Sequence, residues 1–265
     1  YWGLQMNLID KNKKGTIILS HYRSGGTQLK TTIEKALITS NIDFIDLNEI
    51  NLNVEIGTSF DKQLNELLTS DRYTLVLLNN PLTINYIYTK QMFKQLSEDF
   101  VIVGLKRKDK LKTLLSMGVW EELIHQGLFH KENITESEMV EFHNNLLENK
   151  LPYHTIHLGW ENDIFSTDKN VSPRFYLNYL LKIYFDECRL LDNTISEFNI
   201  PTIYYEDYEY NTSYLKQFFS NLKIDTDFMS KTNLKIPYHS RKFEQYYEPF
   251  IVDILKDWGL IDDEH

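Results

Sequence analysis

The chain has 265 residues, of which 42% are hydrophobic and 14% aromatic, so it can bury a substantial core in one large α/β domain. Its formal net charge of −10 argues against a nucleic-acid coat or a binder of anionic membranes, since both need a basic surface. The single cysteine, Cys188, excludes an internal disulfide and any CxxC metal site. We therefore expect one domain over residues 1–265, a cytoplasmic location and no nucleic-acid partner.

The beginning of the chain shows no targeting signal. It lacks the basic and then hydrophobic pattern of a secretory signal, and the apolar runs of the chain are too short to span a bilayer. We expect no transmembrane segment. Met6 is expected to be the natural start, so that residues 1–5 carry no function.

The first predicted elements are a strand over 16–19 and a helix over 27–40, joined by a loop with two adjacent glycines. Such a junction directs backbone N–H groups and the positive end of a helix dipole at one point, which suits a phosphate or sulfate. Arg23 adds a guanidinium group, and Ser24 and Thr27 add hydroxyl donors. A tight turn without a ligand is the alternative. Gly-Lys-Ser/Thr does not occur in the sequence, which disfavours an ATP-binding loop.

The second predicted strand, over 42–47, ends beside Glu49. A carboxylate there would lie at the carboxyl edge of a parallel sheet, where open α/β folds bind their ligands. A solvated loop residue is the other interpretation of Glu49. Helices are predicted over 57–69 and 83–96, and a buried strand over 73–79.

A fourth strand, predicted over 100–105, runs into a dense basic cluster at 106–110 and then into a helix that carries Ser116. Alternating strands and helices predict a parallel sheet that is covered on both faces. The cluster could be an ordinary solvated surface. However, both strand-to-helix junctions open at the same edge of such a sheet, so together they could hold one elongated ligand with two anionic groups.

Later segments predict a strand near 153–158, a helix over 180–198, a strand that starts near Ile200, and an amphipathic helix over 244–258. Residues 117–170 are rich in aromatic and histidine side chains, and we expect them to form an insertion beside the binding site of a second molecule, an acceptor.

Three motifs resemble those of the sulfotransferase superfamily. Arg23-Ser-Gly-Gly-Thr-Gln-Leu29 resembles its loop for the 5′-phosphosulfate, and Leu105 to Ser116 resembles its segment for the 3′-phosphate. In that segment a basic residue precedes the serine by eight positions; Lys108 has this spacing and Arg107 lies next to it, so either could fill the role. Tyr205-Glu-Asp-Tyr208 is similar to the superfamily's Tyr-Glu-Asp-Leu. The bacterial carbohydrate sulfotransferases are the most similar group.

The resemblance implies a three-layer α/β/α fold with a central parallel sheet, the sulfotransferase fold related to the P-loop nucleotide kinases. It implies transfer of a sulfuryl group from 3′-phosphoadenosine 5′-phosphosulfate (PAPS) to a hydroxyl acceptor, such as a carbohydrate or another small alcohol, which leaves 3′-phosphoadenosine 5′-phosphate (PAP). Relatives often bring a basic residue of a late loop onto the 3′-phosphate. Arg241 matches this residue by its order in the chain alone, and Lys235 is the alternative. The implied cofactor-binding residues are Arg23, Ser24, Gly25, Gly26, Thr27, Gln28, Arg107, Lys108, Ser116 and Arg241.

An alcohol acceptor also needs a base. In several relatives this base is a glutamate after the second strand, and Glu49 matches it by its order in the chain. Asp46 is the fallback and His21 a third candidate. Arg23 is expected to stabilise the leaving oxygen. No metal is expected, because sulfuryl transfer in this superfamily needs none. Two alternatives stay open, a nucleotide or nucleoside kinase-like phosphotransferase and a non-catalytic nucleotide-binding protein that keeps the fold. The acceptor and the oligomeric state are not determined by the sequence.

Overall fold

The computed structural model divides the chain into two compact units, residues 1–108 with 186–234 and residues 109–185 with 235–265. The single domain expected over residues 1–265 stays a prediction. The described residues are 7–21, 24–47, 69–78, 90–109, 112–113, 154–157, 168–171, 173–209, 217–220 and 251–259, with the single positions 135, 137, 141, 214, 222 and 248.

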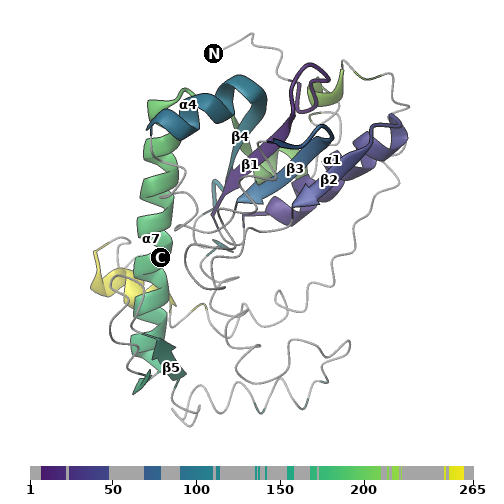
Figure 1. The fold of residues 1–265 in the computed structure, drawn as a ribbon. Coiled ribbons are helices and arrows are strands. Elements are labelled where there is room, and N and C mark those ends of the chain that lie inside the picture. The colour runs from purple at the N-terminus through teal and green to yellow at the C-terminus, as the bar shows by residue number, and fades with distance from the viewer. Residues whose placement is uncertain are drawn as a thin grey trace. The chain divides into compact units, whose positions relative to one another are not determined.

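The first unit contains a five-stranded sheet in the order β2-β3-β1-β4-β7, in which all paired strands are parallel (Figure 1). Its strands are β1 (Gly15–Ser20), β2 (Phe44–Leu47), β3 (Tyr73–Leu78), β4 (Phe100–Lys106) and β7 (Thr202–Tyr204). Every residue of β1 and β3 is buried, as expected for central strands of a parallel sheet. The predicted strands are confirmed, with boundaries that differ by one or two residues.

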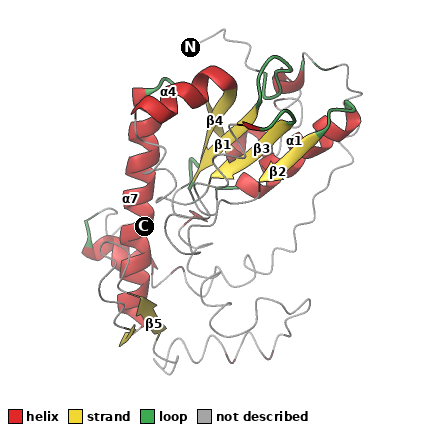
Figure 2. Ribbon diagram, in the orientation of Figure 1, coloured by secondary structure: helices red, strands yellow, loops and turns green. Residues whose placement is uncertain are grey.

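Helices cover both faces of this sheet (Figure 2). Helix α1 (Gly26–Thr39) packs its buried residues against one face, together with Ile18 of β1. The opposite face, with the neighbouring Ile17, packs against α4 (Lys90–Asp99) and the last part of α7 (Pro173–Glu197). Because successive side chains of a strand point to opposite faces, these are two separate cores. The predicted parallel sheet with helices on both faces is confirmed as an α/β fold.

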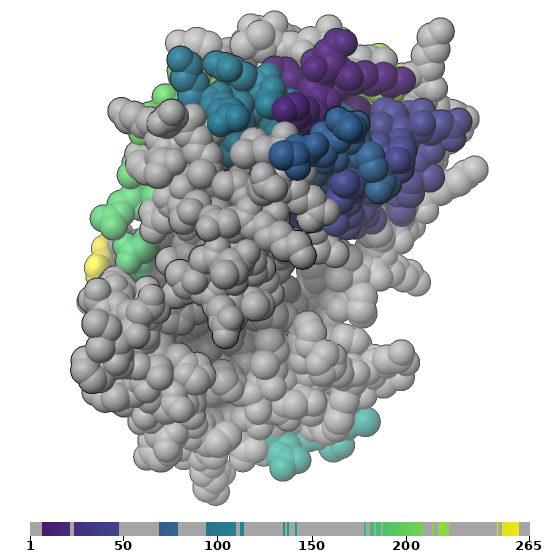
Figure 3. Space-filling model, in the orientation of Figure 1, coloured from purple at the N-terminus to yellow at the C-terminus, as the bar shows by residue number. Residues whose placement is uncertain are grey.

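Segments that are distant in the sequence lie next to one another on the surface of the first unit. Figure 3 shows surface atoms from parts of residues 7–47, 69–78 and 90–109, in purple, blue and teal, next to one another on one face. Helix α4 ends at residue 99, three residues beyond the predicted end, and the predicted helical residues 57–68 and 83–89 lie outside the described residues.

The second unit contains a two-stranded antiparallel sheet of β5 (His154–His157) and β6 (Asp168–Val171), and the first part of α7. Helix α7 starts at Pro173, seven residues before the predicted start, because a proline fits the first position of a helix. Residues 251–257 are helical, and the helix ends before Gly259 as predicted. None of the helices in the described part of the chain has the length and apolar character needed to cross a membrane.

Candidate functional site

The carboxyl ends of β1, β4 and β7 meet at one edge of the sheet. Ser20 at the end of β1 is paired with Leu105 of β4, and Lys106 at the end of β4 is paired with Tyr204 of β7. Along the chain, β1 is followed by β2, which lies on the β3 side of the β1–β4 pair. In contrast, β4 is followed by β7, which lies on the opposite side of that pair. Neighbouring strands that diverge in this way form a topological switch point, which is where open α/β sheets bind their ligands.

The loop after β1 leads into the N-terminus of α1. Ser24 is 1% exposed, and its hydroxyl donates a hydrogen bond of 2.8 Å to the carbonyl of His21, which is also buried. The Gly25 carbonyl accepts the N–H of Leu29 at 3.1 Å, so Gly25 starts the helix. No described side chain caps this N-terminus. Its N–H groups are therefore suitably placed for an anion.

Gly25 is held by two tyrosines of helix α8 (Tyr205–Glu209). The Tyr208 hydroxyl donates to the Gly25 carbonyl at 3.1 Å. Gly25 has a φ of +90°, and a Cβ atom on it would lie 2.1 Å from Cδ2 of Tyr205. A side chain is therefore excluded both by the backbone conformation and by the ring. Sequence reasoning missed this contact.

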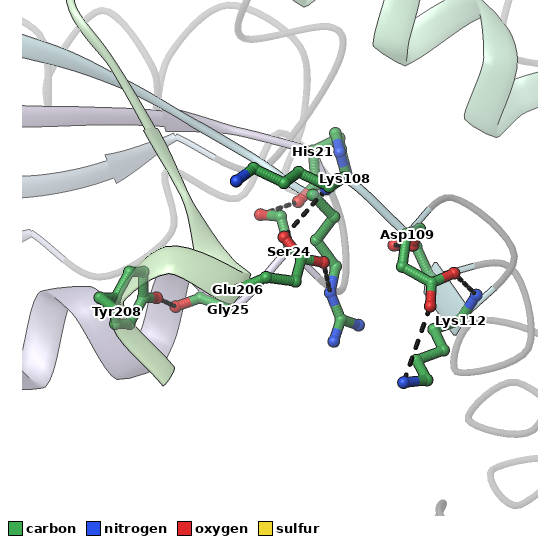
Figure 4. A network of polar contacts seen from close by, with 10 residues as sticks. His21, Ser24, Gly25, Lys108, Asp109, Lys112, Glu206 and Tyr208 are labelled. Atoms are coloured by element: carbon green, nitrogen blue, oxygen red, sulfur yellow. Dashed lines mark hydrogen bonds and ion pairs between the residues drawn. The ribbon is translucent and has the colours of Figure 1, made fainter. Parts of the chain in front are cut away.

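The basic junction after β4 is also held by α8. The Lys108 N–H donates to Oε2 of Glu206 at 2.9 Å, and Nε of Arg107 lies 3.5 Å from Oε1 of the same carboxylate. The Lys108 ammonium forms an ion pair with Asp207. Figure 4 shows Lys108 and Glu206 together with the contact of Tyr208, also of α8, with Gly25 of the loop after β1.

Aromatic rings complete the surroundings of these two cations. The Arg107 guanidinium lies 4.6 Å from the centroid of the Tyr205 ring, and the Lys108 ammonium lies 5.3 Å from that of Tyr204. The hydrogen bond with Asp207 raises the pKa of Lys108 above its usual value, although desolvation opposes this. Burial raises the pKa of Tyr214, to which the negative charge of Asp207 also contributes. Lys108 therefore carries its full positive charge at neutral pH, and Tyr214 stays uncharged.

Helix α8 thus contacts both predicted anion-binding segments at once. Its tyrosines hold the loop after β1, while Glu206 and Asp207 supply two negative charges to Arg107 and Lys108. The sequence motif Tyr205-Glu-Asp-Tyr208 does not by itself indicate what these acids contact. The sequence offers one signal, that two acids follow a predicted late strand and are opposite in charge to the only dense basic cluster, but it does not say that this strand lies next to β4.

Lys106 and Asp109, on either side of these two residues, make other contacts. Lys106 forms an ion pair with Asp192 of α7. The Asp109 carboxylate accepts the backbone N–H of Lys112 at 2.9 Å, an N-cap contact at the start of a helix that includes residues 112–113. This agrees with the helix predicted from about residue 111.

Several predicted site residues lie outside the described residues, namely Arg23, Glu49, Ser116 and Arg241. Asp46, the fallback base, lies near the end of β2, with its carboxylate 2.6 Å from the ammonium of Lys30. Lys30 lies 2.7 Å from Glu34 as well, and its side chain is only 7% exposed. Burial would lower the pKa of Lys30, but its hydrogen bonds to Asp46 and Glu34 raise it above the usual value. Asp46 is therefore engaged in a strong ion pair.

Among the described residues, no group of three or more histidine, cysteine, aspartate or glutamate side chains could hold a metal ion. The expectation that no metal takes part stays a prediction. The structure brings Ser24, Gly25, Gly26, Arg107 and Lys108 to one edge of the sheet. Comparisons with protein-family models, curated proteins and solved structures found no match, so function is inferred from these residues alone.

Proposed function

We propose that the protein is a PAPS-dependent sulfotransferase of the bacterial carbohydrate type, with the three-layer sulfotransferase fold. The observation that supports this most is the convergence of three separate motifs at one switch point. The Tyr-Glu-Asp segment after β7 contacts both the loop after β1 and the basic residues after β4 there. The two basic residues stand in a chain with a net charge of −10, so the positive charge at this edge is local.

In this proposal the donor lies along the edge of the sheet. The 5′-phosphosulfate is held by the N–H groups of Gly25, Gly26 and Thr27 at the N-terminus of α1, with Ser24, Gln28 and Arg23 beside it. Arg107 or Lys108 holds the 3′-phosphate, and Ser116, which lies outside the described residues, stays a predicted partner. Two anion sites at the ends of the neighbouring strands β1 and β4 suit a nucleotide with two anionic groups.

The reaction transfers the sulfuryl group without a covalent enzyme intermediate. The acceptor oxygen forms a bond to sulfur while the bond from sulfur to the bridging phosphate oxygen breaks, and the electron pair of that bond stays on the phosphate. Helix N–H groups and Arg23 stabilise this developing charge, and a base accepts the acceptor's proton. Catalysis is then mainly positioning and charge stabilisation, as in phosphoryl transfer.

A thermal-shift comparison of PAP with ATP tests the donor. At a concentration of about 100 times its dissociation constant, a ligand stabilises the folded state by about 2.7 kcal/mol, so PAP should raise the melting temperature by about 5 to 10 °C. ATP should have a much smaller effect, since it has no 3′-phosphate for the basic junction. Stabilisation by ATP alone would contradict the proposal and favour the kinase-like phosphotransferase.

Transfer of labelled sulfate from PAPS to glycan, phenol and lipid acceptors tests the activity. Label on a glycan would support the carbohydrate class. Binding of PAP without transfer to any acceptor would instead favour a non-catalytic nucleotide-binding protein.

The base is tested by replacing Glu49 with glutamine. If Glu49 accepts the proton, E49Q lowers turnover far more than donor affinity, because an amide keeps the shape but cannot act as a base. D46N and H21Q are the comparison variants. Asp46 is ion-paired with Lys30 and His21 is buried, so neither replacement should lower turnover as much as E49Q does. Equal losses of turnover and of donor affinity in E49Q would contradict this assignment.

A further inference from the structure

The two acids of α8 have different tasks at the basic junction. Glu206 accepts the backbone N–H of Lys108 at 2.9 Å and faces Nε of Arg107, so it holds the turn after β4 in place. Asp207 instead contacts the terminal ammonium of Lys108. The side chains of Lys108 and Asp207 are 54% and 30% exposed, so this ion pair can open by side-chain rotation alone.

We propose that Asp207 is an internal competitor for the nucleotide's 3′-phosphate and sets how tightly the protein holds it. The inference rests on the proposed function, because it assigns Lys108 to that phosphate. A phosphate monoester carries a charge of about −1.5 to −2 at neutral pH and three acceptor oxygens, whereas a carboxylate carries one negative charge. The phosphate therefore displaces Asp207 from Lys108, and the carboxylate returns when the nucleotide leaves.

The competition acts on the donor and on the product alike, since PAPS and PAP carry the same 3′-phosphate. The ion pair of Lys108 with Asp207 must open before Lys108 can bind the phosphate, which reduces the net binding free energy. The nearby Asp207 carboxylate also repels the phosphate while it is bound. Asp207 thus weakens retention of PAP, and release of product is a step that often limits turnover. A nucleotide without a 3′-phosphate does not have to open the pair and is unaffected.

The test measures the binding of PAP and of adenosine 5′-monophosphate to the full chain and to Asp207→Asn. An exposed ion pair contributes modestly, so D207N should bind PAP about three- to tenfold more tightly, with a slower dissociation rate. Its affinity for adenosine 5′-monophosphate should change by less than about twofold. Circular dichroism melting confirms folding, and Asp207→Ala is a second variant with the same expected direction.

Asp192→Asn is the matched control. Asp192 forms an ion pair with Lys106, the basic residue two positions before Lys108, but it lies on α7. D192N should leave PAP affinity unchanged. This separates competition for Lys108 from a general change in the charge of the protein.

A double-mutant cycle with Lys108→Met locates the effect. In the K108M background, D207N should no longer tighten PAP binding. PAP affinity that is unchanged or weaker in folded D207N, or an equal gain with and without Lys108, would overturn the inference while leaving the proposed function intact. Failure of the unaltered protein to bind PAP at all would overturn the proposed function, and the inference with it.

Discussion

Replacement of Gly25 by alanine should destabilise the first unit by about 2 to 5 kcal/mol and weaken PAP binding by about 100-fold or more. Gly25 has a φ of +90°, and a residue with a Cβ atom in this conformation lowers the free energy of unfolding by about 1 to 2 kcal/mol. The new methyl group would also lie 2.1 Å from the Tyr205 ring, and relief of such overpacking costs about 1 to 3 kcal/mol more. Removal of this overlap requires the loop of Gly25 or α8 to move. The N–H groups at the N-terminus of α1 are then no longer placed to bind the 5′-phosphosulfate. Urea unfolding and PAP titration measure the two effects.

Gly259→Ala is the control for backbone strain alone. Gly259 also has a positive φ, of 66°, but nothing lies within 4 Å of a Cβ atom built on it. G259A should cost about 1 to 2 kcal/mol, at the end of its helix, and leave PAP affinity unchanged. If G25A cost no more stability than G259A and bound PAP normally, the contact between α8 and Gly25 would have no role in the site.

Sequence patterns were sufficient for elements whose signal is local. The strands that became β1 and β3 are apolar along their whole length, and burial on both faces is the reason. Two adjacent glycines between such a strand and a helical pattern correctly indicated the loop of Gly25. Local patterns also gave the helix that ends before Gly259.

The contacts that assemble the candidate site could not be predicted in this way. Lys108 and Glu206 are 98 positions apart, and Tyr208 and Gly25 are 183 apart. They meet because β4 lies between β1 and β7 in the sheet, and the periodicity of a strand carries no information about its neighbours. The pairing of acids with the basic junction follows from that strand order.

Lys30 is a second case in which local reasoning is insufficient. It follows Leu29, which is buried in the core, and its own side chain is 7% exposed. The helical pattern of α1 does not explain why a lysine is stable at this buried position. The reason is a carboxylate on each side, Glu34 one turn later and Asp46 on β2. Burial of a charge is acceptable only with such partners.

Lys30→Met should therefore lower the free energy of unfolding by about 2 to 3 kcal/mol at neutral pH. Breaking a fully buried ion pair costs about 3 to 5 kcal/mol, because a charge remains without its partner. The cost is smaller here since Glu34 and Asp46 are 21% and 28% exposed, and water can solvate them partly. Lys14→Met is the matched control. Lys14 pairs with Asp99 at 2.8 Å, but the side chains are 43% and 34% exposed, so K14M should cost less than about 1 kcal/mol.

The difference between the unaltered protein and K30M should also depend on pH. Because folding raises the pKa of Lys30, its stabilising contribution is complete below the value of the unfolded lysine, 10.5, and is lost as the pH rises through the higher folded value. Urea unfolding from pH 8 to pH 11.5 should thus show a constant gap that narrows only above about pH 10.5. A gap that closes near neutral pH would contradict the ion pair as the cause. A gap no larger than that of K14M would mean that Lys30 stabilises the fold no more than an exposed lysine does.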